Sequence, residues 1–133
     1  MPTDNEEAAR RFAAAVTNGD CEAAVSVCHP EIEFYSVLGI SGRAYLGHDG
    51  IRRYFDDVES AWKEWRVEVE RVEEGADGRV AIVMTMHASG KESGASLAER
   101  TGHIWTLRDG KLAHNEPYRE PEQALRDLGL SPS

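Results

Sequence analysis

The segment TGHIWTLRDGKLAHNEPY, at residues 101–118, predicts two antiparallel strands joined by a tight turn. Asp109 and Gly110 form the turn, because both central residues of a type I′ turn need a positive φ and these residue types tolerate it. A two-residue turn also fixes the register of the two strands. With Arg108 opposite Lys111, alternation along each strand places one set of side chains on a common face. This set is His103, Trp105, Leu107, Leu112, His114, Glu116 and Tyr118.

The end of this face away from the turn carries imidazole and carboxylate groups, whereas a purely structural sheet face would stay apolar. The predicted register sets His103 opposite Glu116, with His114 beside them. A carboxylate that orients an imidazole raises its basicity and selects its tautomer. In a partly dry pocket such a group can remove a proton from carbon next to a carbonyl, or activate water. His103, His114 and Glu116 are therefore the candidate catalytic residues.

Other interpretations of the same three residues stay open. They can contact a ligand without chemistry, or form a satisfied polar cluster with a structural role alone. Two histidines and one glutamate also meet the ligand count of a zinc or iron site. That spacing is a weak signal by itself, and no Cys-x-x-Cys pair accompanies it. We therefore expect neither a metal nor another cofactor.

Aromatic, hydroxyl and thioether side chains supply further candidate contacts for a ligand. A tyrosine hydroxyl can donate to a developing enolate oxygen, an indole offers a flat wall, and methionine adapts to irregular shapes. Each of these side chains also has a plainer interpretation as a core residue. The candidate ligand-binding residues are Tyr35, Tyr54, Trp62, Trp105, Tyr118, Met84 and Met86.

Periodicity and capping residues on both sides of the hairpin predict the rest of the fold. Thr3 and Glu6 match a capping box at the start of a first helix, Gly19 ends that helix, and Pro121 opens a last one. Helices followed by a run of consecutive strands indicate an α+β domain whose helices cover one face of a curved sheet. The predicted helices span residues 3–18, 21–28, 48–62 and 121–128, and the predicted strands span 31–38, 65–73, 79–88, 97–107 and 111–119.

The composition fits one globular domain over residues 1–133. A formal charge of −9 argues against nucleic acid or an anionic membrane as a partner, since both require a basic patch. Cys21 and Cys28 fall in one predicted helix at a separation of roughly 10 Å, which is too far for a disulfide. The acidic N-terminus lacks the apolar run of a secretory signal, and no segment reaches membrane-spanning length, so we expect a cytoplasmic protein.

Four stretches of the sequence carry a family pattern in their order and spacing. They are Asn18-Gly19-Asp20, His29-Pro30-Glu31-Ile32-Glu33-Phe34, Gly47-His48-Asp49-Gly50-Ile51, and Trp105-Thr106-Leu107-Arg108-Asp109-Gly110-Lys111-Leu112 followed by Glu122-Gln123-Ala124-Leu125. The pattern resembles the SnoaL-like group of the NTF2-like superfamily, which is related to polyketide cyclases and ketosteroid isomerases. The resemblance implies a cone-shaped α+β fold, with a curved antiparallel sheet wrapped around the N-terminal helices. It also implies a deep, usually metal-free pocket and a homodimer packed through the outer sheet face.

The sequence departs from the catalytic members of that superfamily. Ketosteroid isomerase-like enzymes place a general-base aspartate on the first strand, and the nearest residue here is Ser36, which cannot serve as that base. Cyclase-like members place an acid-base aspartate in the later strands, where the inward carboxylate predicted here is Glu116. The hydrolase-like Asp-Arg-Asp set has no clear counterpart. The resemblance therefore transfers the fold and the pocket, but no specific reaction.

The sequence thus predicts a small-molecule-binding NTF2-like protein. Its expected ligand is a small apolar or aromatic molecule that carries a carbonyl or hydroxyl group. The leading hypothesis is a cofactor-independent isomerase, cyclase or lyase that acts by proton transfer. The alternatives are a ligand-binding or regulatory module without turnover, and a protein-interaction domain. Catalysis requires His103, His114 and Glu116 to converge on an accessible cavity.

Overall fold

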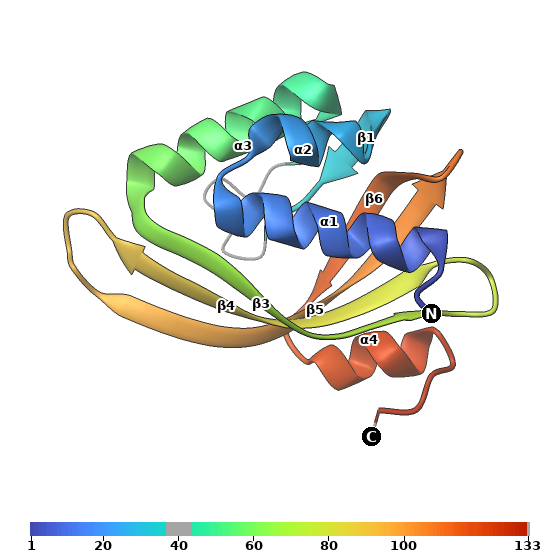
Figure 1. The fold of residues 1–133 in the computed structure, drawn as a ribbon. Helices are drawn as coiled ribbons and strands as arrows, with labels where there is room; N and C mark the ends of the chain where they lie inside the picture. Colours follow the sequence, from blue (N-terminus) through green and yellow to red (C-terminus); the bar gives the residue numbers. More distant parts are fainter. Residues whose placement is uncertain (37–43, 133) are drawn as a thin grey trace.

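The computed structural model describes residues 1–36 and 44–132, and it has the predicted α+β architecture (Figure 1). Parts of the predicted strand 31–38 and of the predicted loop after it fall on residues 37–43, outside the described residues. The helices are α1 (Asp4–Asn18), α2 (Cys21–Ser26), α3 (Gly47–Ala61) and α4 (Pro121–Asp127). The strands are β1 (Cys28–Phe34), β2 (Tyr45–Leu46), β3 (Trp62–Glu74), β4 (Val80–Gly90), β5 (Ser96–Arg108) and β6 (Lys111–Tyr118).

The ends of the first two helices are set by the predicted capping residues. The backbone N–H of Glu6 donates to Thr3 Oγ1 at 3.1 Å, and the Glu6 carboxylate accepts from the Thr3 N–H at 3.0 Å. This capping box satisfies two of the donors that a helix start leaves unpaired. Gly19 ends α1 with a φ of 67°, and Asp20 then caps α2 by accepting from the Ala23 N–H at 3.1 Å. These predictions are confirmed.

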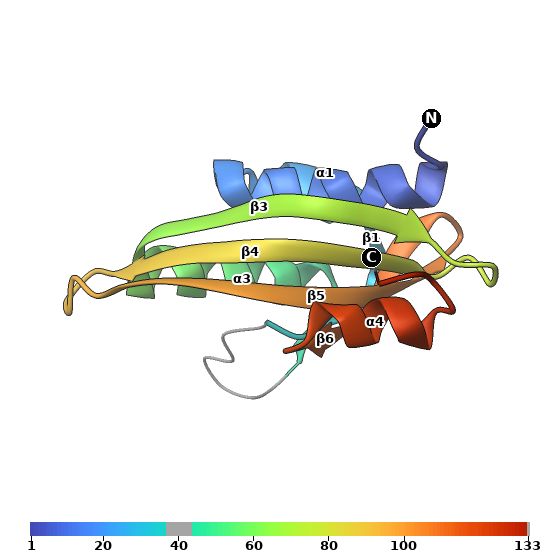
Figure 2. The same cartoon turned by 90° about the horizontal axis from the view of Figure 1, so that it is seen from below.

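The six strands form one curved sheet in the order β2-β1-β6-β5-β4-β3. All neighbouring pairs are antiparallel except β1 and β6, which are parallel, so the sheet is mixed. The long strands β3, β4 and β5 lie side by side and bend together (Figure 2). At the β3 edge, Thr17 of α1 bonds both backbone groups of Val67, because its hydroxyl accepts from the N–H at 2.8 Å and donates to the carbonyl at 3.2 Å.

The core lies between the concave face of the sheet and α1, α2 and α3. The prediction that all helices cover one face is wrong for α4, which packs on the opposite face (Figure 1). There Leu125 contacts Ala81 and Val83 in a second, smaller apolar cluster. Gly102 explains how α4 approaches so closely, since a Cβ at this position would lie 2.9 Å from the Pro121 Cα. The outer sheet face is therefore partly buried.

The hairpin between β5 and β6 has the predicted turn, with φ values of 54° at Asp109 and 74° at Gly110. Arg108 pairs with Lys111 and Leu107 with Leu112, as predicted, but the next pair joins Thr106 to His114. Ala113 is thus an additional residue on β6, which is a β-bulge. Because side chains alternate with a period of two, a one-residue shift sends every later β6 side chain to the other face.

In the described residues, no helix has the length and apolar character needed to cross a membrane.

Candidate functional site

The bulge at Ala113 separates the three predicted catalytic residues. His103 stays on the concave face and is only 3% exposed, but its partner across the strands is Pro117 rather than Glu116. Glu116 is exposed on the outer face, opposite Ile104. His114 is also on the outer side, where it pairs with Thr106. The predicted convergence of His103, His114 and Glu116 is therefore wrong, and a metal site built from these three residues fails for the same reason.

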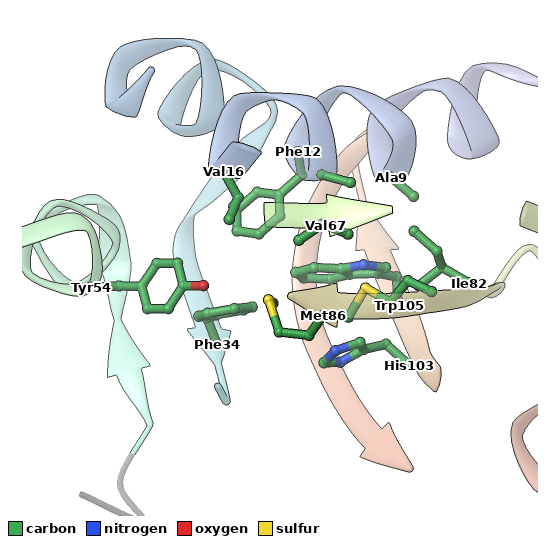
Figure 3. Close-up of a pocket in the computed structure, with 12 residues that line it drawn as sticks. Ala9, Phe12, Val16, Phe34, Tyr54, Val67, Ile82, Met86, His103 and Trp105 are labelled. Atoms are coloured by element: carbon green, nitrogen blue, oxygen red, sulfur yellow. The ribbon is translucent and has the colours of Figure 1, made fainter. Parts of the chain in front are cut away.

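His103 instead lines a cavity of about 30 Å³ between the sheet and α1 (Figure 3). Of the predicted ligand contacts, four line this cavity: Tyr54, Trp105, Met84 and Met86. The remaining wall is apolar and includes Phe12, Val16 and Phe34. A volume of 30 Å³ holds one or two water molecules, whereas small-molecule pockets span about 300–1,000 Å³. The described side chains thus nearly fill the concave face in this conformation.

The other three predicted ligand contacts lie away from the cavity. Tyr35 follows β1, and its ring is 5.8 Å from the ring of His114 on the outer side. Tyr118 faces α4, where its hydroxyl donates to an Asp127 carboxylate oxygen at 2.6 Å. Trp62 begins β3 and lines a separate groove. Tyr118 faces away from the cavity because β6 has shifted register, and Tyr35 does so because β1 turns its odd-numbered residues outward. That any of the three contacts a ligand stays a prediction.

Aromatic rings hold the cavity wall together. Trp105 packs edge-on against Phe12, with ring centroids 5.2 Å apart, and stacks on Phe34 at 5.9 Å and 12°. The His103 ring lies over the other side of this cluster, 6.5 Å from Trp105 and nearly parallel to it. Aromatic contacts of this kind add stability beyond the area they bury. They also leave the His103 ring little freedom to rotate.

Asn115 holds His103 through the ring nitrogen Nδ1, and it was not among the site residues predicted from the sequence. Its side chain is fully buried, and its Oδ1 accepts from the Tyr35 N–H at 2.7 Å. Its Nδ2 donates to the Tyr35 carbonyl at 2.8 Å and lies 2.9 Å from His103 Nδ1. The predicted register places Asn115 on the outer face, and no glycine marks the bulge that turns it inward.

This network determines the tautomer of His103. A backbone N–H can only donate, so the Tyr35 N–H identifies the Asn115 oxygen and leaves the amide NH₂ facing His103. Nδ1 of the histidine must then accept, and the ring proton sits on Nε2. Burial lowers the pKa of His103 to about 4. At neutral pH the ring is therefore uncharged, and its Nε2–H is a hydrogen-bond donor rather than a base.

Tyr54 supplies a second polar group to the cavity wall. Its hydroxyl accepts from the Trp65 indole N–H at 2.9 Å in a buried contact. Burial raises the pKa of Tyr54, so the phenol keeps its proton. Because the oxygen serves Trp65 as an acceptor, its O–H is free to donate. The cavity thus has two neutral donors, His103 and Tyr54, in otherwise apolar surroundings.

A groove of about 610 Å³ adjoins the cavity. It lies between the end of α1, the start of α2, α3 and the start of β3, and it includes Trp62 and Trp65. Val16 and Tyr54 line both spaces. The Tyr54 ring and its hydrogen bond to Trp65 therefore lie between the groove and the cavity.

Comparison with known structures supports the fold. An NTF2-like protein of unknown function from Burkholderia pseudomallei has a TM-score of 0.78 at 18% identity, over 96% of this chain and 98% of that one. A putative polyketide cyclase from Pseudomonas putida has a TM-score of 0.74 at 18% identity, over 96% and 99%. TerC, co-crystallized with polyporic acid, has a TM-score of 0.76 at 27% identity, over 95% and 98%. The chain resembles all three along nearly its whole length.

Sequence comparison identifies the family. None of the curated proteins compared with the chain matches it. The family model of the SnoaL-like domain matches residues 9–115, which include most of α1, the strands β1 to β5 and Asn115. This match covers most of the chain. The protein belongs to the SnoaL-like family.

Proposed function

We propose that this protein binds a compact apolar carbonyl compound through His103, and that it acts on it as a cofactor-independent isomerase or cyclase. The observation that carries the proposal is a buried, neutral histidine whose one free polar edge is Nε2–H. A fixed donor in an apolar, water-poor site stabilises charge that develops on a carbonyl oxygen without reorganising at the moment of reaction. Such a donor acidifies the carbon next to the carbonyl, so that a water molecule, for which the cavity has room, can take up the proton as the enol forms.

His103 acts here as an electrophile and not as the proton acceptor. Its Nδ1 is occupied by Asn115, and its Nε2 already carries the proton. No carboxylate lines the cavity among the residues that the structure describes. This second observation favours an alternative function, in which the protein binds the carbonyl compound and does not turn it over.

The ligand reaches His103 from the groove. The 610 Å³ groove has the size of a small-molecule pocket, and the cavity beside it expands when Tyr54 swings away from Trp65. Met84 and Met86 have unbranched side chains that rearrange at low cost, so the cavity wall can adapt. TerC was co-crystallized with polyporic acid, and this compound is therefore one candidate ligand.

The ketone preference of the cavity tests the binding step. Butyrophenone and butylbenzene have the same size but differ in one carbonyl oxygen. We expect wild-type protein to bind the ketone about tenfold more tightly in calorimetry, since one net hydrogen bond contributes about 1–1.5 kcal/mol. His103→Phe removes the donor and should abolish this preference, whereas the matched apolar change Met84→Leu should keep it. Equal affinities for the two compounds in wild-type protein would refute the proposal.

Proton exchange separates the two functions. If the protein catalyses enolisation, it will accelerate hydrogen–deuterium exchange next to the butyrophenone carbonyl in D₂O, and His103→Phe will remove the acceleration. Binding without any acceleration would leave the ligand-binding module as the function.

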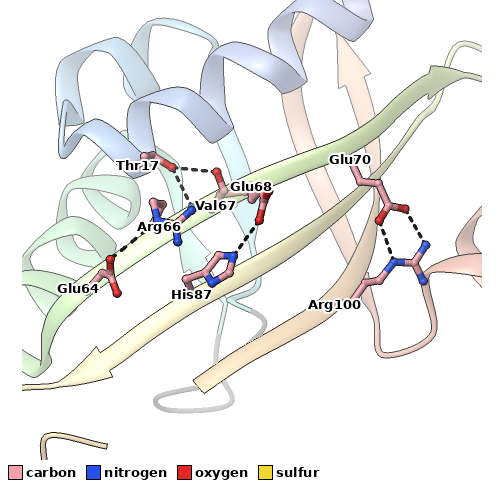
Figure 4. A network of polar contacts seen from close by, with 8 residues as sticks. All are labelled: Thr17, Glu64, Arg66, Val67, Glu68, Glu70, His87 and Arg100. Carbon is pink, nitrogen blue, oxygen red and sulfur yellow. Dashed lines mark hydrogen bonds and ion pairs between the residues drawn. The ribbon is translucent and has the colours of Figure 1, made fainter. Parts of the chain in front are cut away.

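We also propose a homodimer through the outer face of β3, β4 and β5. This face carries charges of both signs, which can pair with their copies across a two-fold axis (Figure 4). His87 Nε2 lies 2.9 Å from Glu68 Oε1, and Arg100 contacts both oxygens of Glu70. Light scattering should give twice the chain mass of 14.7 kDa, and Arg100→Glu should shift it toward one chain mass. A single-chain mass for wild-type protein would exclude the dimer.

A further inference from the structure

The groove between α1, α2, α3 and the start of β3 has an aromatic wall. Trp62 and Trp65 line it together with Tyr54 and Phe55. The ring centroids of Trp62 and Trp65 are 5.2 Å apart and the rings are inclined at 47°, while Tyr54 meets Trp65 at 71°. At about 610 Å³ the groove has the size of a small-molecule pocket. It therefore has room for a ligand of its own.

The two indole side chains meet the groove with carbon. Trp65 Nε1 donates to the Tyr54 hydroxyl in a buried contact. Trp62 Nε1 is buried too, and within the part of the chain that the structure describes it has no hydrogen-bond partner. Since both nitrogens are buried, a ligand in the groove meets the ring carbons of these side chains. The face of an indole ring carries partial negative charge, so it attracts a cation.

Carboxylates from two helices also line the groove. Asp56 and Glu59 are three residues apart on α3, so they share one face of that helix. Glu22 lines the groove from α2. Its partner is Arg52 of α3, whose Nε lies 3.3 Å from Glu22 Oε1 and whose Nη1 lies 3.1 Å from Asp49 Oδ1. Two carboxylates thus balance the charge of Arg52, whereas Asp56 and Glu59 add negative charge.

The balance of charge in the groove is negative. Among the described residues that line it, the three carboxylates outnumber the two cations, Arg52 and Lys63. Cys21 on α2 responds to this field. Burial is the main cause that raises the pKa of its thiol, and the carboxylates of Glu22 and Asp56 raise it further, whereas Arg52 lowers it. A groove that is both negative and aromatic is complementary to an organic cation whose charge is spread over methyl groups.

We propose that the groove binds a quaternary ammonium compound, at a site separate from His103. The methyl groups of the cation pack against Trp62 and Trp65, and Asp56 and Glu59 balance its charge from the exposed face of α3. This site does not depend on the proposed function, because His103 lines the cavity and is not among the described residues that line the groove. The two sites can therefore be tested with different ligands.

Choline and dimethylbutanol, the neutral analogue in which carbon replaces the ammonium nitrogen, test the inference. The two compounds have the same shape and differ in charge. Calorimetry in about 0.15 M salt should show that wild-type protein binds choline about tenfold more tightly. Trp62→Leu removes an aromatic face and should reduce this ratio to about two, whereas Trp62→Phe keeps a ring and should retain a larger part of the ratio.

A matched pair of charge variants separates this site from general attraction to an acidic chain. Asp56→Asn combined with Glu59→Gln changes two exposed side chains of the groove and should lower the choline ratio about threefold. Asp109→Asn combined with Glu120→Gln removes the same charges at the β5–β6 turn and before α4, and it should keep the ratio.

Three results would overturn the site. The first is equal affinity of wild-type protein for choline and dimethylbutanol, or no binding of either. The second is an unchanged ratio in Trp62→Leu, with a wild-type circular dichroism spectrum as the check that the variant folds. The third is an equal fall of the ratio in both charge variants, since the net charge of −9 alone would then attract the cation.

Discussion

Replacing Asn115 with alanine is expected to lower the free energy of unfolding by about 3–5 kcal/mol, as measured by urea denaturation. The change leaves the Tyr35 N–H, the Tyr35 carbonyl and His103 Nδ1 without a partner, and each buried orphan costs about 1–3 kcal/mol. Asn5→Ala is the matched control, because Asn5 makes a single bond of 3.3 Å to the Gly78 carbonyl. It should cost about 1 kcal/mol or less.

Asn115→Asp separates the structural role of this residue from its control of the histidine. The carboxylate keeps the shape and can still accept from Tyr35, but it presents an acceptor to His103 Nδ1 in place of a donor. The ring proton should therefore move to Nδ1, and the pKa of His103 should rise, because a carboxylate favours the imidazolium. Loss of the ketone preference should accompany this change. If Asn115→Ala costs less than about 1 kcal/mol, the network does not hold the site together.

Trp105→Ala is the second change with a large expected effect, a loss of about 3–5 kcal/mol in the free energy of unfolding. Trp105 is 3% exposed and contacts the rings of Phe12, Phe34 and His103. Its removal enlarges the apolar cavity, and such cavities bind small aromatic molecules. Added indole should therefore raise the Tm of the variant but not that of wild-type protein.

Trp62→Ala is the comparison for this experiment. Trp62 is half-buried at the groove and contacts Trp65, with ring centroids 5.2 Å apart. Trp62→Ala should lower the free energy of unfolding by less than Trp105→Ala does. Added indole should not specifically restore the stability of the Trp62→Ala variant. An equal loss at both positions would mean that the aromatic cluster under α1 is not the centre of the core.

The sequence predicted those parts of the fold that local chemistry determines. Thr3, Gly19 and Asp20 set helix ends through caps that involve residues within a few positions along the chain. The Asp109-Gly110 turn is equally local, because only a positive φ at both residues closes it. The position of α4 depends on contacts between residues far apart in the sequence. Gly102 is the one sequence feature that indicates it, since a side chain at this position would meet Pro121.

The candidate site was only half predictable, because its geometry depends on one additional residue in β6. The bulge at Ala113 carries no glycine or proline signal, and it exchanges the inward and outward residues of the strand beyond it. His103 lies on β5, so its inward position was predicted correctly. Its partner Asn115 was not predicted, because Asn115 bonds Tyr35 across a β1–β6 pairing that joins residues 80 positions apart. Tyr54, Trp105, Met84 and Met86 line the cavity because their helix and strand periods are regular.

The pH dependence of His103 follows from its burial. The pKa is lowered to about 4 in the folded protein, whereas an unfolded histidine titrates near 6.5. Above about pH 7 both states are neutral and the residue makes no pH-dependent contribution. As the pH falls from about 6.5 to 4, the unfolded chain takes up the proton first, so His103 contributes a loss of stability over this window.

An NMR titration of His103 that assigns the proton on each ring nitrogen tests its role as a neutral donor most directly. We expect a neutral ring with its proton on Nε2 from about pH 5 to 8, and protonation only near pH 4. A proton on Nδ1 at neutral pH, or a pKa at the ordinary histidine value near 6.5, would contradict it.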